Sequence, residues 1–265
     1  VLAMVLAAKR AGFEIVYVPL ANLAEASCVE GIKVISVSHL VEVLNEFGVS
    51  TKALRSTEIV SAPASLVREN QSLCMSEVRG QAEAVDAAVV AAAGGHHMIM
   101  VGTPGSGKTM IAQRVHTLLP DLSQDEAIEL AAMRSLVNRP SFDTLDYAAP
   151  LEAPHHSASM VSVIGGGSGV PKPGLASLAS HGVLFLDEAP EFSTVTIDAL
   201  RQPLESGDIT LSRATATVQY PAKFQLVLAA NPCPCGKGQI KTDACQCAER
   251  IKARYLAKIS GPILD

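Results

Sequence analysis

Residues 102–109, Gly-Thr-Pro-Gly-Ser-Gly-Lys-Thr, constrain the fold of this chain more than any other stretch. They match the phosphate-binding pattern G-x-x-x-x-G-K-[ST], and the apolar run 97–101 before them predicts a short buried strand. A helix over about 108–118 should follow, with its positive dipole end facing the loop. The residues expected to surround phosphate oxygens are Gly102, Thr103, Pro104, Gly105, Ser106, Gly107, Lys108 and Thr109.

Two acids follow a second apolar run, the predicted strand 183–186. In a phosphate-loop enzyme, an acid on an adjacent parallel strand reaches the Mg²⁺ that the loop hydroxyl also holds. We therefore expect Thr109 and Asp187 to bind Mg²⁺, and Lys108 to contact the β- and γ-phosphates. Glu188 would polarise the water that attacks the γ-phosphate. The alternative for the two acids is a buried strand that ends in a solvated acidic turn.

A third polar residue, Asn231, ends the predicted strand 225–230. Its amide would orient the attacking water, although an Asn-Pro pair can also simply open a turn. The three strand ends together predict an α/β fold of the P-loop NTPase type, with a parallel sheet flanked by helices. Lys108, Glu188 and Asn231 are the predicted catalytic residues.

Composition limits the partners of this chain. The net charge of −5 gives no overall basic field for nucleic acid, so any such contact must be local. Aromatic residues make up only 4%, which argues against broad base-stacking surfaces. The apolar start is too short to span a membrane, and the cysteine pattern is unlike a disulfide framework. We expect no membrane association and a cytoplasmic location.

The first 48 residues predict helix, strand, helix, strand and helix, too little to bury a core alone. The expected elements are helix 1–12, strand 14–18, helix 23–28, strand 32–37 and a helix capped by Ser38 that runs through Phe47. Residues 49–73 are expected to form a linker. The later elements expected are helix 81–93, helix 123–137 behind a capping box, strand 151–153, loops 165–169 and 171–174, helix 193–206, and a hairpin of 209–212 and 217–220.

Several motifs together resemble the AAA+ module of the magnesium chelatase-like proteins, in its YifB/ComM branch. They are residues 102–109, 182–188, 200–205 and 230–235, with 153–157, 165–168 and 260–265 also matching. The resemblance covers residues 74–265. Residues 1–48 are similar to the end of the Lon-protease-like (ribosomal S5-type) domain that precedes this module in the family.

The resemblance implies an ATPase in which residues 102–109 are Walker A, Asp187 and Glu188 are Walker B, and Asn231 is sensor 1. ATP and Mg²⁺ are the implied cofactors. The family places an inter-subunit arginine directly after the Leu-Asp at 264–265, with a fifth strand and a helical lid further on. We therefore expect this chain to be part of a longer protein, able to bind ATP and poorly active alone.

The family's hexameric ring implies self-association, and two insertions of its clade face the central pore in relatives. They correspond to residues 155–174 and 208–221, so that Lys172 and Arg213 become candidate contacts to a DNA backbone. Solvated loop charges are the alternative for both. His155 and His156 lie in the first insertion, and without a partner spacing for a metal we expect them to be structural.

Four cysteines form the pattern C-x-C-x₉-C-x-C. Thiolates of Cys233, Cys235, Cys245 and Cys247 can close a tetrahedral Zn²⁺ site, although each pair is one residue tighter than the usual C-x₂-C. Free thiols or a redox-labile pair are the alternatives.

The resemblance implies an ATP-hydrolysing ring motor acting on DNA, as a helicase in branch migration during recombination of transforming DNA. One alternative is the motor subunit of a metal chelatase. Another is a nucleotide-switched, chaperone-like assembly module, which would have little use for a water-activating acid at Glu188.

Overall fold

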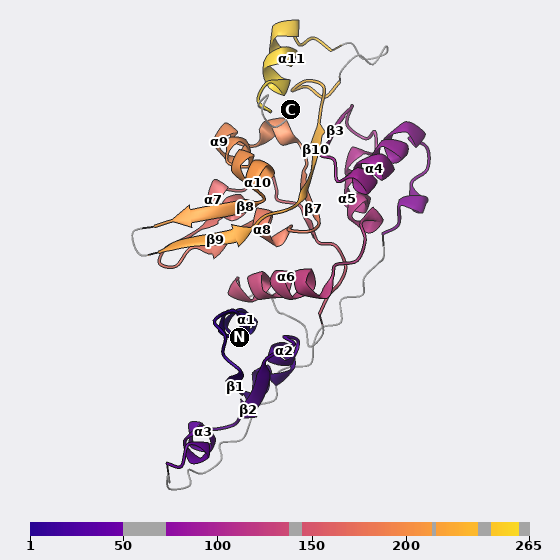
Figure 1. Cartoon of the computed structure of the whole chain (residues 1–265). Helices are drawn as coiled ribbons and strands as arrows, with labels where there is room; N and C mark the ends of the chain where they lie inside the picture. Colours follow the sequence, from indigo (N-terminus) through magenta and orange to yellow (C-terminus); the bar gives the residue numbers. More distant parts are fainter. Residues whose placement is uncertain (50–72, 138–144, 214–215, 238–244, 260–265) are drawn as a thin grey trace. The chain divides into compact units, whose positions relative to one another are not determined.

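Figure 1 shows the chain as a computed structural model that describes residues 1–49, 73–137, 145–213, 216–237 and 245–259. The chain divides into two compact units. The first comprises Val1–Asn70 with Ser123–Tyr147, and the second Gln71–Leu122 with Ala148–Asp265. The predicted linker 49–73 lies almost entirely outside the described residues. The motif 260–265 lies entirely outside them. Within the described part, no helix is both long and apolar enough to cross a membrane.

The first unit follows the order predicted from the sequence and adds one helix from further along the chain. Its elements are α1 (Leu2–Arg10), β1 (Ile15–Pro19), η1 (Leu20–Asn22), α2 (Leu23–Ser27), β2 (Lys33–Val37), α3 (Leu40–Glu46) and α6 (Gln124–Leu136). Strands β1 and β2 pair in parallel. Leu2 and Val5 of α1 share a buried cluster with Ile128 and Ala132 of α6. The division into domains at residues 48 and 74 stays a prediction.

The predicted cap of α3 is wrong by one residue. The helix begins after His39, whose extended backbone (φ −142°, ψ 146°) makes it the N-cap, and its side chain makes no capping hydrogen bond. Ser38 instead donates its backbone N–H to Glu42 Oε2 over 3.2 Å. The acid one turn into the helix therefore satisfies the peptide group before the cap.

The capping box that opens α6 is confirmed. Ser123 Oγ accepts from Glu126 N–H at 3.4 Å, and Glu126 Oε2 accepts from Ser123 N–H at 2.8 Å. Ser123→Ala is expected to lower the free energy of unfolding by about 1 kcal/mol, because the backbone N–H of Glu126 loses its side-chain acceptor. Denaturant unfolding of Ser123→Ala beside the hydroxyl-retaining Ser123→Thr tests this. Equal stability of Ser123→Ala and the wild type would contradict it.

The second unit contains the predicted phosphate loop. Its helices are α4 (Ala82–Gly94), α5 (Lys108–Val115), α7 (Met160–Ile164), α8 (Leu175–Leu178), α9 (Thr194–Asp198), α10 (Arg201–Ser206) and α11 (Glu249–Leu256). Its strands are β3 (Met98–Val101), β4 (Leu151–Glu152), β5 (Gly165–Gly166), β6 (Lys172–Pro173), β7 (Val183–Leu186), β8 (Asp208–Ser212), β9 (Thr217–Pro221) and β10 (Gln225–Ala230). Short 3₁₀ turns are η2 (Met75–Glu77), η3 (His116–Leu118) and η4 (Ala189–Glu191).

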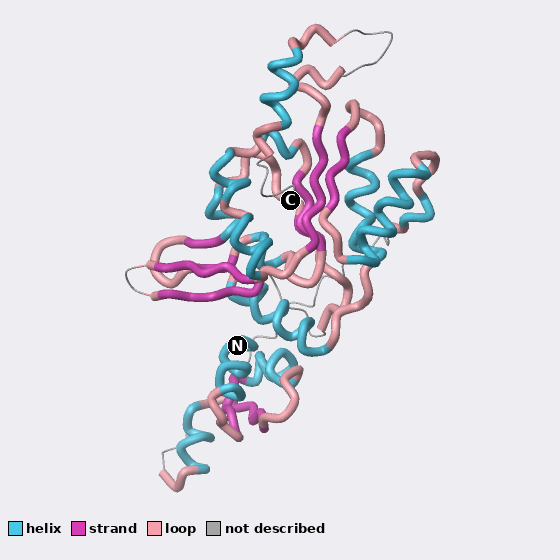
Figure 2. The backbone as a smooth tube through the Cα atoms, turned by 45° about the horizontal axis from the view of Figure 1, so that its top comes forward, coloured by secondary structure: helices cyan, strands magenta, loops and turns pink. Residues whose placement is uncertain are grey.

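The predicted α/β class is confirmed, because four parallel strands form one sheet in the order β3-β10-β7-β4. Alternate residues of the central strands enter two buried clusters on opposite faces. Val183 and Phe185 pack with α4 and α5, whereas Leu184 and Leu186 pack with α7–α9 and the β8–β9 hairpin. Figure 2 shows the helices on both sides of the strands. The carboxyl ends of β3, β10 and β7 therefore lie side by side.

Two expectations for this unit are wrong. Residues 165–169 and 171–174, expected to be loops, include the antiparallel pair β5–β6. Glycine permits it, since a Cβ at Gly174 would collide with the backbone of Gly165. The single helix expected over 193–206 is two helices, α9 and α10. Pro203 explains the break, because it cannot donate a backbone hydrogen bond to the carbonyl of Ala199.

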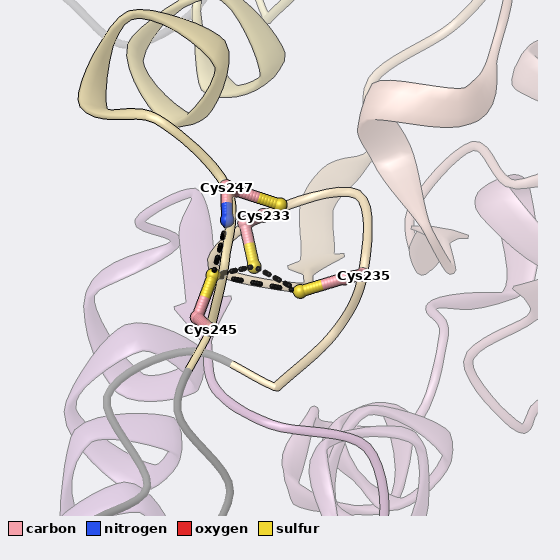
Figure 3. Close-up of side chains that lie close together, drawn as sticks. All are labelled: Cys233, Cys235, Cys245 and Cys247. Carbon is pink, nitrogen blue, oxygen red and sulfur yellow. Dashed lines mark hydrogen bonds between the residues drawn. The ribbon is translucent and has the colours of Figure 1, made fainter.

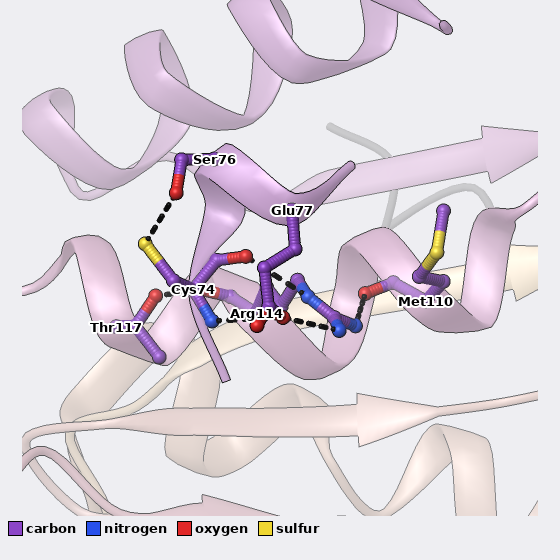
Figure 4. A network of polar contacts seen from close by, with 6 residues as sticks. All are labelled: Cys74, Ser76, Glu77, Met110, Arg114 and Thr117. Carbon is purple, nitrogen blue, oxygen red and sulfur yellow. Dashed lines mark hydrogen bonds and ion pairs between the residues drawn. The ribbon is translucent and has the colours of Figure 1, made fainter. Parts of the chain in front are cut away.

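A polar network attaches the start of this unit to α5 (Figure 4). Arg114 donates from Nε to the carbonyl of Cys74 at 3.1 Å and from Nη1 to that of Met110 at 3.1 Å. Its Nη2 lies 2.9 Å from Glu77 Oε2, and this hydrogen bond is the main cause that lowers the pKa of Glu77. The network fixes the helix that begins at the phosphate loop against the preceding chain.

Candidate functional site

The phosphate loop connects β3 to α5, as the sequence pattern predicts. Gly107 is the N-cap of α5 with φ +86°, a conformation that side chains with a Cβ rarely adopt. At the other end of the loop, a Cβ on Gly102 would lie 2.9 Å from Ser106 Oγ. The glycines thus permit both the left-handed turn into the helix and the close fold of the loop on itself. The N-terminus of α5 faces the loop interior.

Lys108 lies between the loop and the end of β10. Its Nζ donates to the carbonyl of Gly102 at 2.8 Å, to that of Thr103 at 3.0 Å and to Asn231 Oδ1 at 3.4 Å. Burial lowers the pKa of Lys108, while the charges of Asp187 and Glu188 act in the opposite direction. Two of the predicted catalytic residues, Lys108 and Asn231, are therefore in direct contact although far apart in sequence.

Thr109 and Asp187 form the second contact across strands, at 2.8 Å between Oγ1 and Oδ2. Mg²⁺ prefers oxygen ligands at about 2.1 Å in octahedral geometry, which puts neighbouring ligands about 3 Å apart. The two oxygens fit that requirement as they stand. Asp187 Oδ1 accepts from the backbone N–H of Glu188 at 2.9 Å, which fixes the carboxylate orientation.

Glu188 has a partner that the sequence did not suggest. His156 Nδ1 lies 3.1 Å from Glu188 Oε2, and the centroids of the His155 and His156 rings are 4.1 Å apart, with the ring planes tilted by 36°. Strands β4 and β7 pair in parallel, so the segments after them run side by side and bring this histidine to the acid. Glu188 itself has a left-handed backbone (φ +51°), which is unusual for a residue other than glycine.

These groups line one cavity of about 410 Å³. Its walls come from the phosphate loop, the start of α5 and the ends of β7 and β10. The lining residues are Pro104, Gly105, Gly107, Lys108, Thr109, Met110, Asp187, Glu188, Ala230 and Asn231. The cavity combines an anion-binding backbone, one lysine and two acids, a set suited to a phosphate chain with a divalent cation.

The two predicted DNA contacts lie near each other, away from the cavity lining. Gly166 pairs with Lys172 in the β5–β6 ladder, and a Cβ on Gly166 would lie 3.2 Å from Arg213 Nη2. Tyr220 of β9 donates its hydroxyl to the carbonyl of Pro171 at 2.7 Å, which holds the hairpin on this loop. Both cationic side chains belong to exposed residues.

The four cysteines of the predicted cluster also meet, beyond the end of β10 (Figure 3). The sulfur of Cys233 lies 3.3 Å from that of Cys235 and 3.5 Å from that of Cys245, and the last two are 3.5 Å apart. All four sulfurs, including that of Cys247, lie within 4.8 Å of one another. None of the six cysteines of the chain forms a disulfide.

The sequence of this chain is similar to that of a known protein family. Residues 74–265 match the family described as magnesium chelatase, subunit ChlI. An uncharacterized protein of Mycobacterium tuberculosis is 48% identical over 267 residues, covering 100% of this chain and 52% of the relative. Competence protein ComM of Haemophilus influenzae is 44% identical over 266 residues (100% and 51%). The uncharacterized protein YifB of Escherichia coli is 50% identical over 191 residues (72% and 37%). The chain spans about half the length of the first two.

Proposed function

This chain belongs to the family of magnesium chelatase subunit ChlI, and from that premise we propose that it is the nucleotide-binding part of an AAA+ motor that hydrolyses ATP to remodel DNA. One observation carries the proposal. The ends of three adjacent parallel strands bring Lys108 into contact with Asn231, and Thr109 into contact with Asp187, around one cavity.

Each of these side chains has a distinct role in the proposal. When bound, Mg²⁺–ATP supplies the phosphoanhydride to be cleaved and the metal neutralises its charge. Lys108 balances the charge of the β- and γ-phosphates, and Thr109 and Asp187 hold the metal through oxygen. Glu188 accepts a proton at its carboxylate from the attacking water, which Asn231 orients.

The DNA half of the proposal rests on local charge. Lys172 and Arg213 are exposed residues that both lie beside Gly166, so six copies in a ring would concentrate cations despite the net charge of −5. The similarity to a competence protein supports DNA as the substrate. Further copies of this chain are the proposed partners, in a hexamer.

The ATPase rate of the full-length protein, with and without single-stranded or forked DNA, tests this function. We expect DNA to raise the rate, and the double variant Lys172→Ala/Arg213→Ala to reduce that stimulation several-fold because phosphate contacts are lost. Lys33→Ala, which removes an exposed lysine from the other unit, is the matched control. Absence of any DNA response in the wild type would contradict the DNA-motor proposal.

The family description also favours a second candidate, the motor subunit of a metal chelatase. That function predicts ATPase activity that responds to a partner subunit and ignores DNA. We infer ATP, Mg²⁺ and, at the cysteine cluster, Zn²⁺ as cofactors. The cysteine pattern of the sequence, which is unlike a disulfide framework, supports the proposal of a reducing compartment, the cytoplasm.

A further inference from the structure

The cysteine cluster has the dimensions of a tetrahedral metal site. Four thiolates at about 2.3 Å from Zn²⁺ stand about 3.8 Å apart, and here the sulfurs lie from 3.3 Å to at most 4.8 Å apart. The backbone N–H of Cys247 points at Cys245 Sγ over 3.4 Å, an arrangement that stabilises a thiolate. Four soft sulfur ligands select Zn²⁺ or an iron–sulfur cluster over Mg²⁺.

The segment that carries the first two cysteines also forms part of the nucleotide cavity. Asn231, which contacts Lys108 Nζ at 3.4 Å, precedes the fully buried Cys233 by two positions. Gly236 follows Cys235 directly, and a Cβ there would lie 2.8 Å from Cγ of Pro104 in the phosphate loop. Gly236 N–H also donates to the carbonyl of Cys233 at 2.9 Å, which closes a tight turn against that proline. Both ends of the segment 231–236 therefore contact the phosphate loop.

The four cysteines come from two separate segments of the chain. The segment 231–236 follows the last sheet strand, and Cys245 and Cys247 reach it from residues just before α11. A bound ion would join the two segments through four bonds and fix the turn, because metal-binding free energy becomes folding free energy for such loops. The same bonds would fix the positions of Asn231 and of the backbone against Pro104.

We propose that Cys233, Cys235, Cys245 and Cys247 bind one Zn²⁺, and that this ion holds the turn after β10 against the phosphate loop, so that zinc and nucleotide binding reinforce each other. The linkage rests on the proposed ATP site, whereas the metal site does not. Linkage is reciprocal: if zinc strengthens nucleotide binding, nucleotide must strengthen zinc binding by the same factor.

Metal content tests whether the four cysteines bind zinc. The purified chain is expected to contain one zinc per chain, and Co²⁺ in its place should show the absorption of a tetrahedral tetrathiolate site. Cys245→Ser/Cys247→Ser should lose the metal, whereas Cys74→Ser, which removes an exposed cysteine outside the cluster, should retain it. Absence of metal from the wild type, or the chromophore of an iron–sulfur cluster, would overturn the zinc site.

Titration with a fluorescent ATP analogue tests whether zinc and nucleotide binding reinforce each other. Removal of zinc by a chelator is expected to weaken binding at least about tenfold, and re-addition of Zn²⁺ should restore it. A second measurement needs no cysteine variant. Zinc release from the wild type to a chelator dye is measured with and without Mg²⁺–ATP, and we expect nucleotide to slow it. In Lys108→Ala, which retains the four cysteines, nucleotide should no longer slow release. The linkage is wrong, and the metal site stands, if the wild type contains zinc but zinc removal leaves the ATP affinity unchanged and ATP leaves the rate of zinc release unchanged. Failure of the zinc-loaded wild type to bind ATP would overturn the linkage together with the proposed function.

Discussion

Replacing Glu188 by glutamine is expected to lower the ATP hydrolysis rate of the full-length protein by about 100-fold or more. The amide keeps the shape of the side chain but cannot accept a proton from the attacking water. Binding should persist, because Lys108, Thr109 and Asp187 make their contacts without Glu188. The measurement is single-turnover hydrolysis beside ATP affinity, both under saturating Mg²⁺.

Glu191→Gln provides the matched control, since it changes an exposed glutamate three residues further on in η4. Its hydrolysis rate should stay near that of the wild type. If Glu188→Gln hydrolyses ATP at the wild-type rate, the assignment of the general base is wrong. Another group would then have to accept the proton of the attacking water.

Replacing Lys108 by alanine is expected to weaken ATP binding by about 100-fold, the equivalent of about 2.7 kcal/mol. The lysine is the one cation among the residues that line the cavity, and it opposes the charges of Asp187 and Glu188. Without it, the phosphates would meet two carboxylates with no side-chain charge to balance them. Titration with a fluorescent ATP analogue measures the effect.

Lys223→Ala controls for the loss of a lysine in the same unit. Lys223 is exposed and precedes β10, whereas the site lies after the carboxyl end of that strand. The control should bind ATP as the wild type does. An unchanged affinity in Lys108→Ala, with unfolding curves that match the wild type, would show that the phosphates do not bind in this loop.

Much of the core could be predicted because its strands are continuous apolar runs. The structure bounds β7 and β10 as Val183–Leu186 and Gln225–Ala230, as the sequence predicted. A strand that is buried on both faces is a continuous apolar run, so its ends are clear in the sequence. The polar residues that follow such strands mark the edge of the sheet. Since the three strands are neighbours, the residues after them had to meet.

The contacts that escaped prediction depend on pairing between distant segments. The short strand β4 brings His156 to Glu188, and no spacing in the sequence records that pairing. The packing of Gly236 on Pro104 is equally invisible, because it joins two loops. Helix α6 packs on α1. The periodicity of its side chains predicts an apolar face, but it does not predict which element that face contacts.

The most direct test of the site is calorimetric titration of ATP into this chain with and without Mg²⁺. The contacts of Lys108, and the Thr109–Asp187 pair at 2.8 Å, predict saturable binding of one ATP per chain that is tighter with Mg²⁺. Asp187→Asn should remove most of the Mg²⁺ effect. Absence of saturable binding, or an affinity that neither Mg²⁺ nor Asp187→Asn alters, would contradict the account.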